Sequence, residues 1–304
     1  MKTGKYISRI SDILLESLIE STGAVLIEGA KWCGKTESSL QKANSVVYMQ
    51  DPDEGPGYLA MADTKPSLLL EGNPPLLLDE WQMAPVIWDA VRFAVDKRGL
   101  MGQFILTGSA TPTDDGVAHS GTGRIARMLM RPMSLFESGE SNGKVSLKDL
   151  FNGETEIGAK SILTIDQIAN AICRGGWPAA VVSGKESTQT AMNYVDAIIN
   201  MDIQRVDGIE KDPERVRVLL QSLSRNVSTL ATAKTLMGDM QVNETSITNK
   251  TLTSYLNALR RLFVIEDVPA WQPSLRSKTA IRTSHKRQFV DPSIATAAMR
   301  TNAQ

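Results

Sequence analysis

Residues 29–36 constrain the fold of this chain more than any other stretch. They read Gly-Ala-Lys-Trp-Cys-Gly-Lys-Thr, which matches the Gly-x-x-x-x-Gly-Lys-Thr pattern of a phosphate-binding loop. The apolar run 24–27 before the loop is typical of a buried β-strand, and residues 37–42 after it are compatible with a helix. In a strand-loop-helix unit of this kind, backbone N–H groups face the phosphates of a nucleoside triphosphate.

This loop supplies most of the expected contacts to ATP. Lys35 is expected to reach the β- and γ-phosphates, and the Thr36 hydroxyl to bind Mg²⁺. Tyr6 and Ile7 precede the helical pattern of residues 8–20 and are candidates for covering the base, although packing in the core explains them at least as well. The expected nucleotide-binding residues are Gly29, Ala30, Lys31, Trp32, Cys33, Gly34, Lys35, Thr36, Glu37, Tyr6 and Ile7.

The apolar residues 76–78 end in two carboxylates, Asp79 and Glu80, as in a Walker B motif. Asp79 is expected to hold Mg²⁺ through water, and Glu80 to polarise the water that attacks the γ-phosphate. An acidic pair that opens the next helix is the alternative, because a helix dipole favours carboxylates there. The upstream phosphate loop favours the first interpretation.

A further predicted strand, residues 103–106, ends in Thr107 and Ser109, whose hydroxyls would lie beside the two carboxylates. Such a hydroxyl can sense the γ-phosphate or position the water, as sensor residues do in AAA-type ATPases; a turn that simply ends the strand is the alternative. Arg124, in a glycine-rich stretch, is a candidate for stabilising the transferring phosphoryl group, in cis or from a neighbouring subunit. Arg127 is a weaker candidate, and His119 is interpreted as a loop residue.

Strands that alternate with helices predict an α/β fold: a P-loop NTPase parallel sheet with flanking helices and the ligand at the carboxyl ends of the strands. We expect this domain over residues 1–137, a linker over 138–163, and a mainly helical domain over 164–304. The second domain is expected to contain a winged helix, with helices at 230–237 and 248–262 and strands at 263–265 and 287–290. Helical spacing also predicts one helix over 186–206.

The wing, residues 271–290, is a candidate DNA contact. It contains several cations and no acidic residue. These residues, with a tryptophan beside them, are Arg276, Lys278, Arg282, Lys286, Arg287 and Trp271. Cations of this density can neutralise DNA phosphates, but an ordinary solvated loop is the alternative.

Seven short motifs in this order resemble the predicted AAA-type ATPases of bacteria and archaea that carry a C-terminal domain of unknown function. The motifs are Leu-Ile-Glu-Gly at 26–29, Leu-Asp-Glu-Trp-Gln at 78–82, Ile-Leu-Thr-Gly-Ser at 105–109, Gly-Arg at 123–124, Arg-Pro-Met-Ser-Leu-Phe-Glu at 131–137, Gly-Gly-Trp-Pro at 175–178 and Phe-Val-Asp-Pro-Ser at 289–293. The resemblance implies an ATPase core followed by a winged-helix region. Most members continue into a nuclease-like α/β domain, so we expect a truncated chain without nuclease activity.

The composition of the chain bears on where the protein is located and on the chemistry of its cysteines. No apolar run approaches the roughly 20 residues of a membrane helix, and residues 1–5 lack the apolar core of a signal peptide, so we expect a cytoplasmic protein without a membrane partner. The two cysteines, Cys33 and Cys173, are too few for a disulfide framework or a metal cluster. The Cys33 thiol is interpreted as incidental to the loop; the alternative is an alkylatable thiol, because a helix N-terminus can lower its pKa.

The leading hypothesis is Mg²⁺-dependent ATP hydrolysis coupled to a conformational change in the helical half. The alternative is a nucleotide-gated DNA-binding regulator with slow turnover. A small-molecule kinase is less favoured, because Glu80 beside Asp79 suits water activation. If Arg124 of one subunit stabilises the phosphoryl group in the site of another, the protein is expected to be a homo-oligomer. The sequence motifs do not distinguish ATP from GTP as the bound nucleotide.

Overall fold

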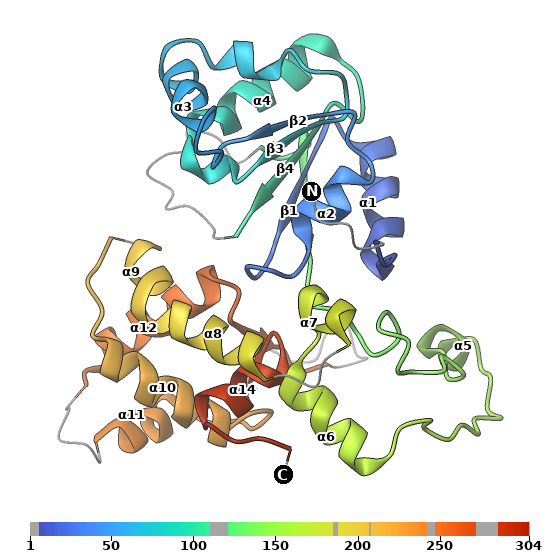
Figure 1. Cartoon of the computed structure of the whole chain (residues 1–304), viewed down its shortest axis with the longest axis vertical. Coiled ribbons are helices and arrows are strands. Elements are labelled where there is room, and N and C mark those ends of the chain that lie inside the picture. The colour runs from blue at the N-terminus through green and yellow to red at the C-terminus, as the bar shows by residue number, and fades with distance from the viewer. Residues whose placement is uncertain are drawn as a thin grey trace.

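The computed structural model describes residues 6–109, 121–184, 188–206, 208–241, 247–271 and 285–303. An α/β half lies at the top of Figure 1 and a mainly helical half lies below it. Among the described residues, no helix has the length and apolar content needed to cross a bilayer.

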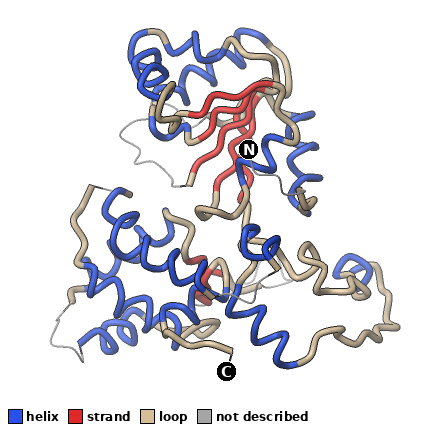
Figure 2. The backbone as a smooth tube through the Cα atoms, in the orientation of Figure 1, coloured by secondary structure: helices blue, strands red, loops and turns tan. Residues whose placement is uncertain are grey.

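The sheet of the N-terminal half is drawn in red in Figure 2. It consists of five parallel strands in the order β2-β3-β4-β1-β5. The strands are β1 (Ala24–Glu28), β2 (Ser45–Tyr48), β3 (Leu76–Asp79), β4 (Phe104–Gly108) and β5 (Ile125–Leu129). Because β4 lies between β1 and β3, its carboxyl end is next to both predicted motifs. In register, Glu28 faces Gly108 and Asp79 faces Thr107.

Helices cover both faces of this sheet, as the alternation of buried side chains along the strands requires. Val25, Leu77 and Ile105 belong to one buried cluster together with Leu15 of α1. The alternate strand positions pack in a second cluster with Trp88 of α4. The helices of this half are α1 (Ile10–Ser21), α2 (Lys35–Leu40), α3 (Gly55–Thr64), α4 (Val86–Arg98) and the 3₁₀ turns η1 (Pro66–Leu70) and η2 (Trp81–Met83).

The C-terminal half is mainly helical, as expected from the sequence. Its elements are α5 (Leu147–Phe151), α6 (Ile165–Arg174), α7 (Pro178–Ser183), α8 (Gln189–Ala197), the π-helical turn η4 (Ile198–Asp202), α9 (Ile203–Arg205), α10 (Pro213–Arg225), α11 (Ala233–Gln241), α12 (Asn249–Arg261), β6 (Ile265–Val268), β7 (Lys286–Phe289) and α14 (Pro292–Ala298). Strands β6 and β7 are antiparallel. The predicted parallel sheet with flanking helices and helical second half is confirmed, while the winged helix and the domain boundaries remain predictions.

Two elements differ from the predictions. Residues 125–129 form the edge strand β5, which was not predicted from the sequence. Its two buried residues, Ile125 and Met128, are three positions apart and face opposite sides of the sheet, so burial does not alternate along the strand as it does in a strand with one buried face. The helix predicted over 186–206 is divided, since α8 passes into the π-helical turn η4 before α9. A π-helical turn of this kind often marks a functional position in a helix.

Three of the resembling motifs meet where the two halves join. The backbone N–H of Met133 donates to the carbonyl of Gly176 at 2.6 Å, and the N–H of Gly176 donates to Oδ2 of Asp291 at 2.8 Å. Trp177 Nε1 donates to the Ser293 hydroxyl at 3.0 Å. A Cβ at position 176 would lie 2.0 Å from the Met133 carbonyl oxygen, so only glycine fits this close approach. The join is therefore a packed junction with buried polar contacts.

Candidate functional site

The phosphate loop runs from the end of β1 to the start of α2, as predicted. Gly29 has φ 151°, and a Cβ there would lie 2.1 Å from the carbonyl oxygen of Met130. Gly34 caps α2 in the left-handed region with φ 104°. The first turn of α2 leaves backbone N–H groups without intrahelical acceptors, which suits an anion at this end.

Lys35 lies within the loop and is almost completely buried. Its Nζ donates to the carbonyl oxygens of Gly29 and Ala30, each at 2.9 Å. A buried ammonium needs such partners, because an unpaired charge is costly away from water. The cation is thus held at the centre of the loop by the loop's own backbone.

Three oxygen-bearing side chains from three elements converge at the carboxyl edge of the sheet. Asp79 Oδ1 accepts from the Thr36 hydroxyl of α2 at 2.7 Å and from the Thr107 hydroxyl of β4 at 2.6 Å. Gln50 Nε2 lies 3.5 Å from the other carboxylate oxygen, Oδ2. Asp79 is 1% exposed, so these polar contacts lie in a largely dry environment.

This oxygen set fits a hard divalent cation such as Mg²⁺, which prefers carboxylate and hydroxyl oxygens. In the described parts of the chain, no group of three or more His, Cys, Asp or Glu side chains could hold a metal ion. A magnesium ion at Thr36 and Asp79 would therefore take its remaining ligands from nucleotide phosphates and water, as is usual for Mg²⁺.

Glu80 has an unusual backbone conformation, with φ 56° and ψ 45° in the left-handed region. A non-glycine residue held there costs about 1–3 kcal/mol, and such residues cluster at functional sites. The Thr107 hydroxyl accepts the backbone N–H of Glu80 at 3.3 Å. The Glu80 side chain accepts through Oε2 from the Ser109 hydroxyl at 3.1 Å and from Gln82 Nε2. Thr107 thus contacts both acidic residues, through the Asp79 carboxylate and the Glu80 backbone, and Ser109 contacts the Glu80 carboxylate.

The structure does not bring Arg124 to this edge. Its carbonyl accepts the N–H of Ala24 at 3.1 Å, so it lies at the start of β1, and a five-residue strand separates it from the loop by about 13 Å. The Arg124 guanidinium pairs with Asp96 at 2.8 Å. Arg127 pairs with Glu28 at 3.1 Å. His119 lies outside the described residues.

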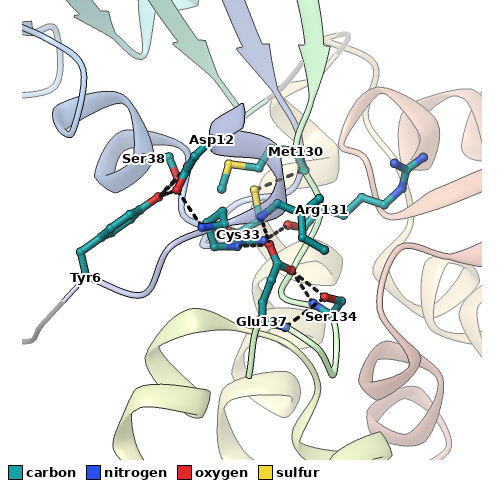
Figure 3. A network of polar contacts seen from close by, with 10 residues as sticks. Tyr6, Asp12, Cys33, Ser38, Met130, Arg131, Ser134 and Glu137 are labelled. Atoms are coloured by element: carbon teal, nitrogen blue, oxygen red, sulfur yellow. Dashed lines mark hydrogen bonds and ion pairs between the residues drawn. The ribbon is translucent and has the colours of Figure 1, made fainter. Parts of the chain in front are cut away.

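Tyr6 is close to the phosphate loop. Its hydroxyl donates to the carboxylate of Asp12 at 2.8 Å and shares a hydrogen bond of 2.8 Å with the Ser38 hydroxyl of α2 (Figure 3). Ile7 is half-buried in the extended segment before α1, and Glu37 is exposed in the first turn of α2.

The environment of Cys33 disfavours a reactive thiol. It is completely buried, and Sγ lies 3.4 Å from the carbonyl oxygen of Met130. Burial raises the pKa of the thiol, although the charges of Lys35 and Arg9 act in the opposite direction. The thiol therefore stays protonated and inert, because desolvation outweighs the helix N-terminus.

A buried ion pair beneath the loop, between Arg9 and Glu137, was not predicted from the sequence. Arg9, the residue before α1, donates from Nη1 to the carbonyl of Cys33 at 2.8 Å, from Nη2 to that of Arg131 at 2.8 Å, and from Nε to Glu137 at 2.9 Å. Figure 3 shows the carboxylate of Glu137 beneath the loop, where it also accepts from Ser134. The pair ties the loop to the segment that leads into the C-terminal half. The position of Arg9 at a predicted helix start was its only signal in the sequence.

Arg287, one of the predicted wing cations, lies in β7 and pairs with Asp267 of β6 at 3.0 Å. Arg260 of α12 contacts the same carboxylate at 2.6 Å. Trp271 and Lys286 are exposed. The other predicted wing cations, Arg276, Lys278 and Arg282, lie outside the described residues.

Comparisons with known proteins agree with this geometry. Residues 21–138 match the model of an AAA domain, and residues 165–304 match a domain of unknown function (DUF8612). No curated protein matches the chain. A Walker-type ATPase of Pyrococcus abyssi has a similar fold, with a TM-score of 0.58 and 14% identity, covering 97% of this chain and 96% of that one.

A RuvB variant of Thermotoga maritima also aligns, with 15% identity over 85% of each chain, but its TM-score of 0.32 is too low to support an argument. The match to an AAA domain covers the part of the chain that contains the parallel sheet and the phosphate loop. Residues 21–138 are therefore an AAA-type P-loop ATPase domain, and residues 165–304 form a domain of unknown function.

Proposed function

We propose that this ATPase hydrolyses ATP in a Mg²⁺-dependent reaction at the carboxyl edge of the sheet, and that turnover changes the conformation of the helical half. The observation that supports this most directly is the convergence of Thr36, Asp79 and Thr107 within hydrogen-bonding distance, with Glu80 beside them. These groups come from the phosphate loop, the Walker B strand and the strand between them, the three elements that a hydrolytic site needs.

In this proposal, the loop backbone and Lys35 bind the β- and γ-phosphates. Lys35 exchanges the carbonyl oxygens of Gly29 and Ala30 for phosphate oxygens, which are stronger acceptors for a cation. Thr36 and Asp79 would hold Mg²⁺. When bound, the ion would neutralise charge on the phosphate oxygens. Tyr6 and Ile7 are proposed to border the base.

Glu80 is proposed to orient the attacking water and accept its proton. The hydrogen bonds from Ser109 and Gln82 fix its carboxylate through Oε2, which leaves Oε1 for the water. Thr107 holds Asp79 and the Glu80 backbone together, so we assign it a positioning role. Arg124 would stabilise the phosphoryl group only from a neighbouring subunit, and activity per molecule would then rise with protein concentration.

Metal titration tests the Mg²⁺ requirement. Phosphate release is measured for the wild type and for Asp79→Asn over a range of Mg²⁺ concentrations. Because an amide oxygen is a weaker ligand than a carboxylate, the variant should need far more Mg²⁺ for half-maximal activity. Identical titration curves for the wild type and the variant would contradict the role of Asp79 as a Mg²⁺ ligand. Undiminished phosphate release in EDTA would contradict the requirement for Mg²⁺.

A nucleotide-gated DNA-binding regulator is the second candidate. The order α10, α11, α12, β6, β7 supports the predicted winged helix, which is a proposal here. Helix α12 contains no acidic residue, and its exposed side chains are Asn249, Lys250, Thr253 and Asn257, which suit contacts to bases and phosphates. The test is duplex DNA affinity against salt, with and without ATP; an affinity that responds to neither contradicts this candidate.

A further inference from the structure

The tip of the phosphate loop is packed into the C-terminal half. Ala30 is completely buried and belongs to the main hydrophobic cluster of the helical half. The ring of Trp32 lies 5.7 Å from that of Tyr194 in α8, and Tyr194 lies 4.4 Å from Trp177. The loop that would surround the phosphates is thus in contact with the second half through its apolar side chains.

An ion pair crosses the same contact. Lys31 Nζ donates to Asp202 Oδ1 at 2.5 Å, and the two side chains are 40% and 9% exposed. Asp202 is the last residue of the π-helical turn η4, in the segment that joins α8 to α9. A carboxylate this deeply buried is stable only with a cation beside it. The helical half therefore presents a buried charge to the loop, and Lys31 is the partner that neutralises it.

Two contacts hold the loop at the neighbouring residues Ala30 and Lys31, one from the helical half and one from within the loop. Outside, Asp202 holds the side chain of Lys31. Inside, Lys35 holds the carbonyl oxygen of Ala30, the residue immediately before Lys31. A bound phosphate would attract Lys35 away from that carbonyl, so the outer contact would then determine where the tip of the loop lies.

We propose that Asp202 is a positioning residue for the nucleotide site, acting through Lys31 to hold the loop tip in its phosphate-binding conformation. This inference rests on the proposed function of the loop. Coupling between two sites is reciprocal, so nucleotide binding also strengthens the contact between the loop and the segment 189–205. The ion pair thus links occupancy of the site to the position of the helical half.

A double-mutant cycle tests this link. The affinity of a nonhydrolysable ATP analogue is measured for the wild type, Asp202→Asn, Lys31→Met and the double variant. Each single change should weaken binding about tenfold, and the double variant should be no weaker than the singles, because both remove the same contact. Asp196→Asn, which changes an exposed carboxylate in the preceding helix α8, is the control and should bind normally.

Hydrogen exchange provides a second measurement, and its wild-type arm does not depend on the stability of a variant. The analogue should slow amide exchange over residues 189–205 in the wild type and leave it unchanged in Asp202→Asn. Unaltered affinity in Asp202→Asn, additive losses of about a hundredfold, or no protection in the wild type would each overturn the inference. Failure of the wild type to bind the analogue at all would instead contradict the proposed nucleotide site.

Discussion

The buried pair of Arg9 and Glu137 gives a prediction whose size follows from the contacts. The two side chains are 5% and 7% exposed. Glu137 Oε1 accepts from Arg9 Nε and from the N–H of Ile10, while Oε2 accepts from the N–H and the hydroxyl of Ser134. Glutamine retains only one of these oxygens, so in either orientation two donors would face an NH₂ group, and Arg9 would be left buried without a counter-charge.

Breaking a buried pair in this way costs about 3–5 kcal/mol. We therefore expect Glu137→Gln to lower the free energy of unfolding by that amount at pH 7, measured by urea denaturation of the whole chain. The matched control is Glu16→Gln, which removes an exposed partner of Lys42, where the loss should stay below about 1 kcal/mol.

The difference should also depend on pH. Burial raises the pKa of Glu137, but the N–H groups of Ser134 and Ile10 and the charge of Arg9 outweigh it and leave the pKa below its ordinary value. The stabilisation is fully present above the unfolded pKa of about 4.3 and is lost as the pH falls through the lower folded pKa. The wild type should therefore approach the variant in acid. A variant within about 0.5 kcal/mol of the wild type at pH 7 would refute this reasoning.

Two further predictions concern the loop and the carboxyl edge. Thr107→Val removes the donor to Asp79 and the acceptor for the Glu80 N–H; since a hydrogen bond to a charged group is worth about 1.5–3 kcal/mol, kcat for phosphate release should fall by about tenfold or more. An unchanged kcat would contradict the positioning role of Thr107. In a Cys173→Ser variant, Cys33 should react with iodoacetamide far more slowly in the folded protein than in urea, because it is buried and its pKa is raised. Equal rates would contradict its burial.

Local patterns predicted the parallel sheet and the carboxyl edge because each motif is contained in a few adjacent residues. Asp79 and Thr107 were placed together by a general property of parallel strands, and the register shows them side by side. Contacts between distant segments leave no such local pattern. Arg9 and Glu137 are 128 residues apart, and Lys31 and Asp202 are 171 residues apart.

The interpretation of Arg124 as a catalytic cation depended on strand β5, which was not predicted from the sequence. Beside the glycines it resembled a catalytic cation, since nothing in the local pattern showed that a strand follows it. Because β5 begins at the next residue and runs parallel to β1, Arg124 lies at the amino end of the sheet. The direction of a strand thus places its flanking residues at one edge or the other.

Glu80→Gln tests the proposed hydrolytic role most directly. The substitution keeps the size of the side chain but removes the group that is proposed to accept the proton. General-base catalysis contributes about a hundredfold or more, so ATP-dependent phosphate release should fall by at least that factor, while affinity for a nonhydrolysable ATP analogue stays near that of the wild type. Equal rates of phosphate release in the wild type and the variant would contradict the assignment.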